Sequence, residues 1–309
     1  MRRYIIKRVI SIFPILIGIL FLSFILINSG ESDPAEVALR VNGVTPTKEA
    51  VTEMREELDL DKPFLKRFII WITSSLKGDF GNSFINGEPV VEEVKQAIPA
   101  TLLLALFSFT IIILMSVLLA IACIIFEEGI IDKVIRICIF LGEAMPSFWV
   151  GLLLIWFFSV NLNLLPTSGM ESLGSIILPG VTLALAYIST YVRILRNNII
   201  QNKRENFVLY AKARGLKEGS IIKHLLKNSL QLSITALGMS IPKLIAGTVI
   251  IENIFAWPGI GRLCVTAIFN QDYPIIQAYV FLMAVLFIVC NLLVDIFTVL
   301  LDPRLRKEA

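Results

Sequence analysis

Charged side chains inside long apolar stretches are the residues of this sequence best suited to do chemistry. Glu143 precedes Pro146 and Lys243 follows Pro242, so we expect both charges to lie beside kinks in helices. A charge in the hydrocarbon layer is costly, and such residues usually serve a substrate path or a specific ion pair. We therefore predict that Glu143 and Lys243 line a central passage and are candidate partners for each other. The alternative is that either side chain reaches toward the membrane surface or binds a neighbouring backbone carbonyl.

Residues for independent catalysis are missing from the sequence. There is no GxxxxGK[ST] loop to hold the phosphates of ATP, and the HExxH and GxSxG motifs are absent. His224 is the single histidine and the four cysteines form no CxxC pair, which disfavours a nitrogen-rich metal site, a histidine-based triad and a disulfide framework. We predict a chain that is not an enzyme, with no catalytic residues, no cofactor and no metal site of its own.

The elements that must position the charged residues are membrane helices. Of the 309 residues, 56% are apolar and 17% are charged, against roughly 45–50% and 25% in soluble domains. The net charge of +3 gives no field that would favour nucleic acid. About 20 apolar residues cross a bilayer as a helix. Six runs qualify, so we predict an all-α membrane protein with six transmembrane helices, at 9–27, 98–126, 137–160, 172–192, 228–251 and 273–301.

The distribution of basic residues predicts the orientation of these helices. The two ends of the chain and the short loops on their side hold eighteen lysines and arginines, whereas the opposite short loops hold only Arg262. Cytoplasmic loops are enriched in Lys and Arg, so both termini are expected in the cytoplasm. We predict three parts: 1–27, the cytoplasmic start and first transmembrane helix; 28–97, an external subdomain; and 98–309, a five-helix core with a cytoplasmic loop at 193–227. A cleaved signal peptide is the alternative for the first run, although no A-x-A-like cleavage site accompanies it.

The external subdomain is expected to contain one helix and one tight turn. Thr47 is suited to cap a helix over Thr47–Phe68, in which apolar residues recur at helical spacing. The segment is acidic, which is typical of a solvated face but also suits docking of an external partner or attraction of cations. Further on, Gly78–Ser83 is expected to form a glycine-shaped turn. The acidic residues are Glu53, Glu56, Glu57, Asp59 and Asp61.

A pair of short helices is expected in the cytoplasmic loop. The first spans Glu205–Arg214, Gly215 is suited to end it in a left-handed conformation, and the second spans Lys217–Lys227. The pair is either a hairpin on the membrane surface or a segment that inserts into a groove of a soluble partner, where small residues permit close approach. The first helix carries an apolar stripe at i, i+3, i+4 and i+7, formed by Phe207, Tyr210, Ala211 and Arg214.

The sequence of this loop resembles a known coupling segment. Tyr210–Gly215 (YAKARG), followed by Leu225–Asn228 (LLKN), resembles the EAA loop of ABC importer permeases in the form found in the peptide/nickel subfamily. It departs from the general pattern at Leu209-Tyr210, where Glu-Ala is usual, and at Lys227-Asn228, where Leu-Pro is usual; both departures suit the subfamily. Other segments agree with the resemblance: Arg2-Arg3-Tyr4, Gly78–Gly81, Met145–Trp149 and Leu301–Arg304.

The resemblance implies the type I ABC importer permease fold in a bacterial cell membrane. Gly247–Arg262 looks most like the first permease subunit of nickel importers, which implies a passage for nickel formed with a second permease subunit. A dipeptide or oligopeptide importer is the alternative. Because bare Ni²⁺ favours imidazole ligands and His224 stands alone, we expect nickel to cross as a chelate with a small organic carrier.

The same resemblance implies further subunits and a role for the loop. Two ATP-binding subunits and an extracytoplasmic substrate-binding protein would complete the importer, with the lipid bilayer as surroundings and no nucleic acid. A stand-alone secondary transporter is a different class, which would work without a separate ATPase. By the resemblance, the ATPase-coupling residues that sit in the ATPase groove are Glu205, Phe207, Tyr210, Ala211, Ala213, Arg214 and Gly215.

Overall fold

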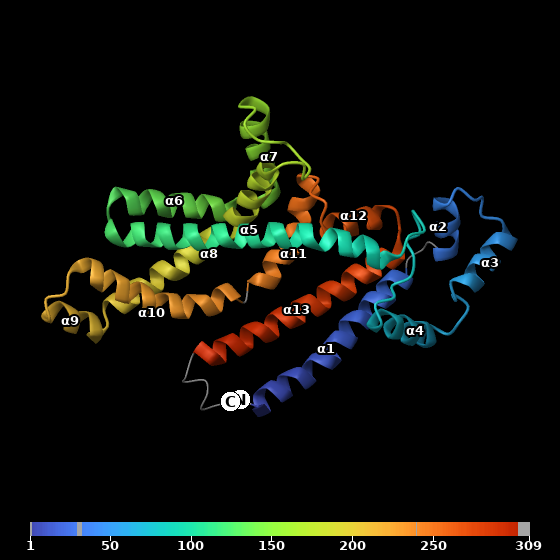
Figure 1. Cartoon of the computed structure of the whole chain (residues 1–309), viewed down its shortest axis with the longest axis horizontal. Coiled ribbons are helices and arrows are strands. Elements are labelled where there is room, and N and C mark those ends of the chain that lie inside the picture. The colour runs from blue at the N-terminus through green and yellow to red at the C-terminus, as the bar shows by residue number, and fades with distance from the viewer. Residues whose placement is uncertain (1, 30–32, 239, 302–309) are drawn as a thin grey trace. The chain divides into compact units, whose positions relative to one another are not determined.

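The computed structural model describes residues 2–29, 33–238 and 240–301, and this part of the chain is built from helices with one isolated bridge between Asn82 and Pro89 (Figure 1). Backbone groups in a membrane must bond within the chain, and a helix bonds them within one segment. The elements are α1 (Arg2–Asn28), α2 (Pro34–Val41), α3 (Lys48–Glu57), α4 (Phe64–Leu76), α5 (Val90–Ile125), α6 (Ile130–Ala144), α7 (Ser147–Leu154), the π-helix η1 (Ile155–Asn161), the 3₁₀-helix η2 (Leu173–Ile176), α8 (Ile177–Lys203), α9 (Asn206–Ala213), α10 (Glu218–Gly238), α11 (Ile241–Ile254), α12 (Ile260–Phe269) and α13 (Tyr273–Leu301).

Four helical segments in the described residues are long and apolar enough to cross a membrane. A fifth crossing is possible if the bent pair Ile130–Ala144 and Ser147–Asn161 acts as one span. The described apolar part of the first helix, Phe13–Asn28, is shorter than these. The all-α membrane class is therefore confirmed, while six spans stay a prediction. The four segments are Val90–Ile125, Leu173–Lys203, Ala236–Ile254 and Tyr273–Ile296.

Two predicted runs are broken at their prolines. Helix α6 ends at Ala144, and α7 starts after Pro146 with a bend of 108° between the two helical segments. Helix α10 ends at Gly238, and α11 starts at Ile241 with Pro242 in its first turn. Proline lacks the N–H that a helix interior needs, so it starts a helix more readily than it continues one. The predicted kink beside Pro146 is confirmed by this bend, whereas the kink beside Pro242 stays a prediction.

The chain divides into two compact units. The first comprises Met1–Thr101 and Pro258–Leu292, and the second comprises Leu102–Trp257 and Leu293–Ala309. In the first unit, α5, α12 and α13 pack through small and branched side chains, and Phe24, Phe68, Trp71 and Phe281 form an aromatic cluster. Each unit therefore has its own apolar core.

The predicted helix over Thr47–Phe68 is two helices. Its cap is confirmed, since the Thr47 hydroxyl accepts a hydrogen bond from the N–H of Ala50 at 3.3 Å. Helix α3 nevertheless ends at Glu57, and the chain turns through a left-handed Asp59 (φ 56°) before α4. The N–H of Asp59 donates to Glu56 and that of Leu60 donates to Arg55, which closes the end of α3 in a Schellman motif.

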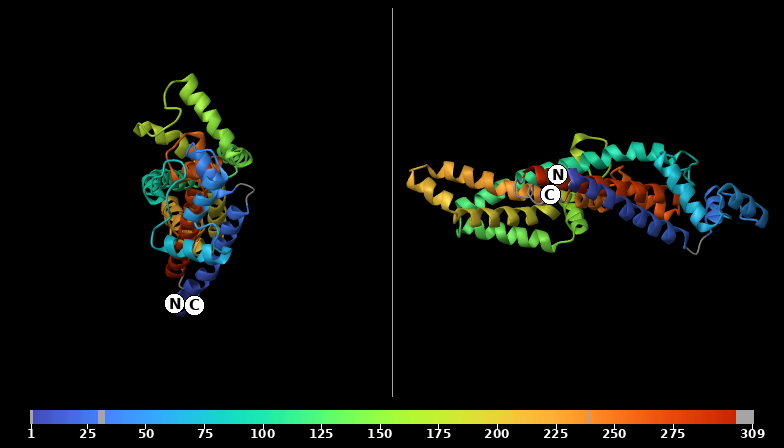
Figure 2. Two further views of the ribbon diagram at one scale, coloured as in Figure 1. Left: turned by 90° about the vertical axis from the view of Figure 1, so that its right-hand side faces the viewer. Right: turned by 90° about the horizontal axis from the view of Figure 1, so that it is seen from below.

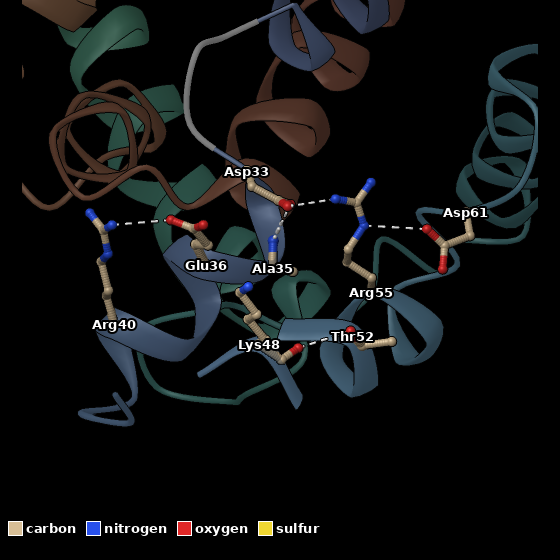
Figure 3. A network of polar contacts seen from close by, with 8 residues as sticks. All are labelled: Asp33, Ala35, Glu36, Arg40, Lys48, Thr52, Arg55 and Asp61. Carbon is tan, nitrogen blue, oxygen red and sulfur yellow. Dashed lines mark hydrogen bonds and ion pairs between the residues drawn. The ribbon is translucent and has the colours of Figure 1, made fainter. Parts of the chain in front are cut away.

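Ion pairs fix the segment around α2 and α3. Arg55 donates to Asp33 at 2.9 Å and to Asp61 at 3.3 Å, which joins α3 to the start of α2 and to the turn before α4 (Figure 3). Lys62 pairs with Asp59 at 2.5 Å. Two of the five predicted acidic residues are thus engaged by neighbouring cations. The expected turn at Gly78–Ser83 is confirmed, with φ of 84° at Gly78 and 78° at Gly81.

Three ion pairs join α8 to α6 and to the residues just before α6. We call them the ion-pair ladder: Glu127–Lys203, Asp132–Arg196 and Glu143–Arg193. Along the ladder the residue numbers of the acids rise as those of the bases fall, so α6 and α8 run antiparallel, and the two helices pack against each other. Asp132 is fully buried, and its two oxygens accept bonds of 3.2 and 3.1 Å from Arg196. The middle pair of the ladder is therefore the one shielded from solvent.

The ladder predicts unequal costs for two similar substitutions. Asp132→Asn leaves Arg196 without its counter-charge, and breaking a buried pair in this way costs roughly 3–5 kcal/mol. Glu143→Gln removes an exposed pair, which contributes only about 0–1 kcal/mol. We expect a clear fall in melting temperature for Asp132→Asn and little change for Glu143→Gln, measured by thermal unfolding of the detergent-purified protein. Equal melting temperatures for the two variants would contradict this account.

Candidate functional site

The predicted pair of helices in loop 193–227 is confirmed as α9 and α10. Helix α9 starts after Glu205 and ends at Ala213, and α10 starts at Glu218 and runs back alongside α8 (Figures 1 and 2). The second helix was predicted to end at Lys227. It continues instead without a break to Gly238. The hairpin and the apolar segment that follows it therefore share one continuous helix.

Gly215 shapes the connection between the two helices. Its N–H donates to the Lys212 carbonyl at 2.9 Å, and the N–H of Leu216 donates to the Ala211 carbonyl at 3.1 Å. These two hydrogen bonds form the Schellman motif, which requires a left-handed residue after the helix. Gly215 has a φ of +71°, as predicted, and a Cβ added there would meet nothing within 4 Å. The requirement for glycine is one of backbone conformation and not of space.

Val208 anchors α9 to α8 and α10. It is 3% exposed and packs in a cluster with Leu195 and Ile199 of α8 and Ile221 and Leu225 of α10. Sequence reasoning missed Val208 because the apolar stripe it identified ran through Phe207, Tyr210, Ala211 and Arg214 and did not include this residue. Its position three residues before Ala211, which packs against the same cluster, was the available signal.

The predicted stripe lines a hollow on the hairpin. A cavity of about 310 Å³ is bordered by all four stripe residues together with Leu216, Ile221 and His224. Tyr210 is 70% exposed, so this face offers an aromatic side chain and the Arg214 guanidinium to an incoming partner. Two other predicted coupling residues, Glu205 and Ala213, are exposed and do not line the hollow.

The two passage candidates do not pair with each other. Arg193 donates to both oxygens of Glu143, at 3.0 and 2.9 Å, so the carboxylate is already engaged. The backbone carbonyl of Lys243 accepts a bond of 2.8 Å from the Tyr187 hydroxyl. The predicted Glu143–Lys243 pair is therefore wrong, because a basic residue on α8 lies closer to the carboxylate. Whether either residue lines a passage stays a prediction.

Metal-binding side chains are scattered through the described part of the chain. Within it, no group of three or more His, Cys, Asp or Glu side chains is arranged to hold a metal ion. The cysteines Cys123, Cys138, Cys264 and Cys290 are free thiols.

Two family models match the chain. Residues 112–307 match the binding-protein-dependent transport system inner membrane component, and residues 1–105 match the N-terminal part of the membrane component of such systems. The metal-staphylopine import system permease protein CntB of Staphylococcus aureus is 39% identical over 100% of both chains. The oligopeptide transport system permease protein AppB of Bacillus subtilis is 35% identical over 99% of this chain and 100% of its own.

A solved structure shares the fold. An amino acid ABC transporter chain, crystallised with histidines, covers 67% of this chain and 93% of its own length with a TM-score of 0.55 at 15% identity. Permeases of this family work with an ATPase and a binding protein. This chain belongs to the family of binding-protein-dependent transport system inner membrane components: it is the multi-pass permease of an ABC importer and not its ATPase.

Proposed function

We propose that this chain, with a second permease, forms the passage through which nickel crosses the membrane as a small organic chelate. The observation that carries the proposal is the relative named for metal-staphylopine import, which matches the whole chain at 39% identity. The resemblance of Gly247–Arg262 to nickel permeases supports the same metal. The importer would comprise two permeases, two ATP-binding subunits and an extracytoplasmic binding protein.

The proposed coupling runs from the hairpin into the transmembrane helices. Tyr210 and Arg214 would enter a groove of the ATPase, with Glu205, Ala213 and Gly215 shaping the segment that docks. Val208 ties α9 to both α8 and α10, so a displacement of α9 would move these helices. The ion-pair ladder joins α8 to α6, and α6 ends at the 108° bend. ATPase closure would thus reach the middle of the permease through packed helices.

The proposed topology keeps the three parts expected from the sequence. Residues 1–27 would hold the cytoplasmic start and first span, 28–97 the external subdomain, and 98–309 the five-helix core. The helical α1 and the bent pair after α5 support six spans with both termini in the cytoplasm. The excess of basic residues on the side of the termini supports this orientation.

A dipeptide or oligopeptide importer is the second candidate. It is favoured by the 35% identity to an oligopeptide permease along nearly the entire chain. Small organic chelators and short peptides both present amine and carboxylate groups to a permease, so one framework suits both classes. By family analogy, the binding protein selects between them.

Substrate uptake distinguishes the two candidates. We expect cells that lack this chain to lose uptake of trace nickel supplied as a chelate and to keep uptake of a labelled dipeptide. Loss of dipeptide uptake alone would overturn the nickel assignment while leaving the permease assignment intact. Comparing free and chelated nickel in the reconstituted importer tests the form that crosses; equal transport of the free ion would contradict the chelate.

The Gly215 turn predicts a variant that uncouples ATP hydrolysis from transport. Gly215→Val places a β-branched residue in the left-handed region, at a cost of roughly 1–2 kcal/mol or more. Gly219, on α10, also has open space around an added Cβ but no positive φ. We expect the ratio of substrate transported to ATP hydrolysed to fall in Gly215→Val and to stay normal in Gly219→Val. Coupled transport in both variants would show that the turn is not required.

The passage role of Glu143 and Lys243 has its own test. We expect Glu143→Gln and Lys243→Met to lower the transport rate, where a loss of about 1.4 kcal/mol is a tenfold decrease. Glu127→Gln is the matched control, because it removes another pair of the ladder. Normal transport in both test variants, or an equal loss in the control, would remove Glu143 and Lys243 from the passage.

A further inference from the structure

A cavity in the first unit has no part in the function described so far. It measures about 260 Å³ and lies among the end of α1, the turn between α3 and α4, the face of α4 and the start of α13. Its walls include the aromatic rings of Phe24, Trp71, Phe84 and Tyr273. Ligand pockets start at about 300 Å³, so this cavity suits a small molecule or a single headgroup.

Arg67 brings a partly buried positive charge to the cavity. Its Nη2 donates to the side-chain oxygen of Asn28, and its guanidinium carbon lies 5.9 Å from the centre of the Phe24 ring. Burial lowers the pKa of Arg67, and the nearby charge of Arg55 lowers it further. Among the described residues no carboxylate pairs with Arg67, since Asp33 and Asp61 are engaged by Arg55 (Figure 3). An anion here would offset the cost of the desolvated cation.

Trp71 adds a second donor on the same face of α4. It follows Arg67 by four residues, which places the two side chains one above the other on the helix. The indole Nε1 is buried and has no hydrogen-bond acceptor in the structure. Nearly all buried polar groups in proteins are paired. Within the described part of the chain, the Trp71 donor therefore lacks an acceptor and Arg67 lacks a paired carboxylate, and a carboxylate or phosphate oxygen would supply both.

Two carboxylates border the same cavity. Asp59 is paired with Lys62, whereas Glu57 makes no ion pair within the described part of the chain. A simple anion would be attracted by Arg67 but repelled by Glu57. A ligand with both an anionic group and an ammonium group satisfies both residues.

We propose that this cavity binds a small zwitterion, with its carboxylate or phosphate on Arg67 and the Trp71 indole and its ammonium group on Glu57. Two sources carry this chemistry: the phosphoethanolamine headgroup of a membrane lipid and a free short peptide. The aromatic walls suit a ligand at the membrane interface, where tryptophan and tyrosine gather. The test of this binding does not depend on the substrate proposed above, because it measures binding and not transport.

The test measures binding to the complete importer purified in detergent. Native mass spectrometry would record binding of dioleoyl phosphatidylethanolamine, of the dipeptide Ala-Ala and of dioleoyl phosphatidylglycerol, which lacks the ammonium group. We expect phosphatidylethanolamine or Ala-Ala to bind, and Arg67→Gln and Glu57→Gln to weaken that binding about tenfold, as for lost charged hydrogen bonds. Lys66→Gln and Glu56→Gln are matched controls, because these neighbours do not line the cavity.

The outcomes separate the sources and decide the proposal. Selective loss of lipid binding in the two cavity variants identifies the headgroup, and selective loss of Ala-Ala binding identifies a soluble zwitterion. The proposal is overturned if neither probe binds or if the cavity and control variants bind alike. Where phosphatidylethanolamine is the probe that binds, equally tight binding of phosphatidylglycerol also overturns it. Should Arg67→Gln fail to fold, Glu57→Gln and Trp71→Phe carry the same test, since Trp71→Phe removes the donor and keeps a ring.

Discussion

The buried ion pair between Asp132 and Arg196 is the constraint on which the second unit depends. A fully buried carboxylate is tolerated only when a counter-charge and hydrogen bonds satisfy it, and Arg196 supplies both. The pair fixes which face of α8 meets α6. Because Lys203 and Arg193 lie on that same face, the two outer pairs of the ladder form in the same register.

This register determines how the hairpin is held. Helix α8 leads through Arg204 and Glu205 directly into α9, and Val208 packs back onto α8 as well as onto α10. The hairpin is therefore attached by its buried side, which leaves Tyr210 and Arg214 on the exposed side. The coupling role proposed for the hairpin needs both properties, because a partner that moves an unanchored loop would not move the helices behind it.

In the first unit, side-chain packing and one buried hydrogen bond join the polar segments to the apolar helices. Small residues of α5, α12 and α13 allow close packing, and aromatic rings fill the space between α1, α4 and α13. The Ser83 hydroxyl donates to buried Asp272 at 2.5 Å and so ties the glycine turn to the residue before α13. The same aromatic arrangement leaves the cavity in which the Trp71 Nε1 lacks an acceptor and Arg67 has no carboxylate partner among the described residues.

Local sequence determined the features that depend on neighbouring residues. The helical class follows from apolar runs, the cap at Thr47 and the glycine turns follow from their residue types, and the break between α6 and α7 follows from Pro146. The boundary of α3 was missed, because the apolar repeat continued across the left-handed turn at Asp59 that ends the helix. The family also came from the sequence, through motifs that the matching models bear out.

Tertiary structure alone decided which distant residues meet. The sequence could not show that Glu143 pairs with Arg193 and not with Lys243. The pairing depends on where two helices lie relative to each other, whereas the residue types allow both pairs. The same reason applies to Val208, which is buried only because α8 and α10 converge on it. The donors of Arg67 and Trp71 share a cavity for this reason as well: helices far apart in the chain enclose them.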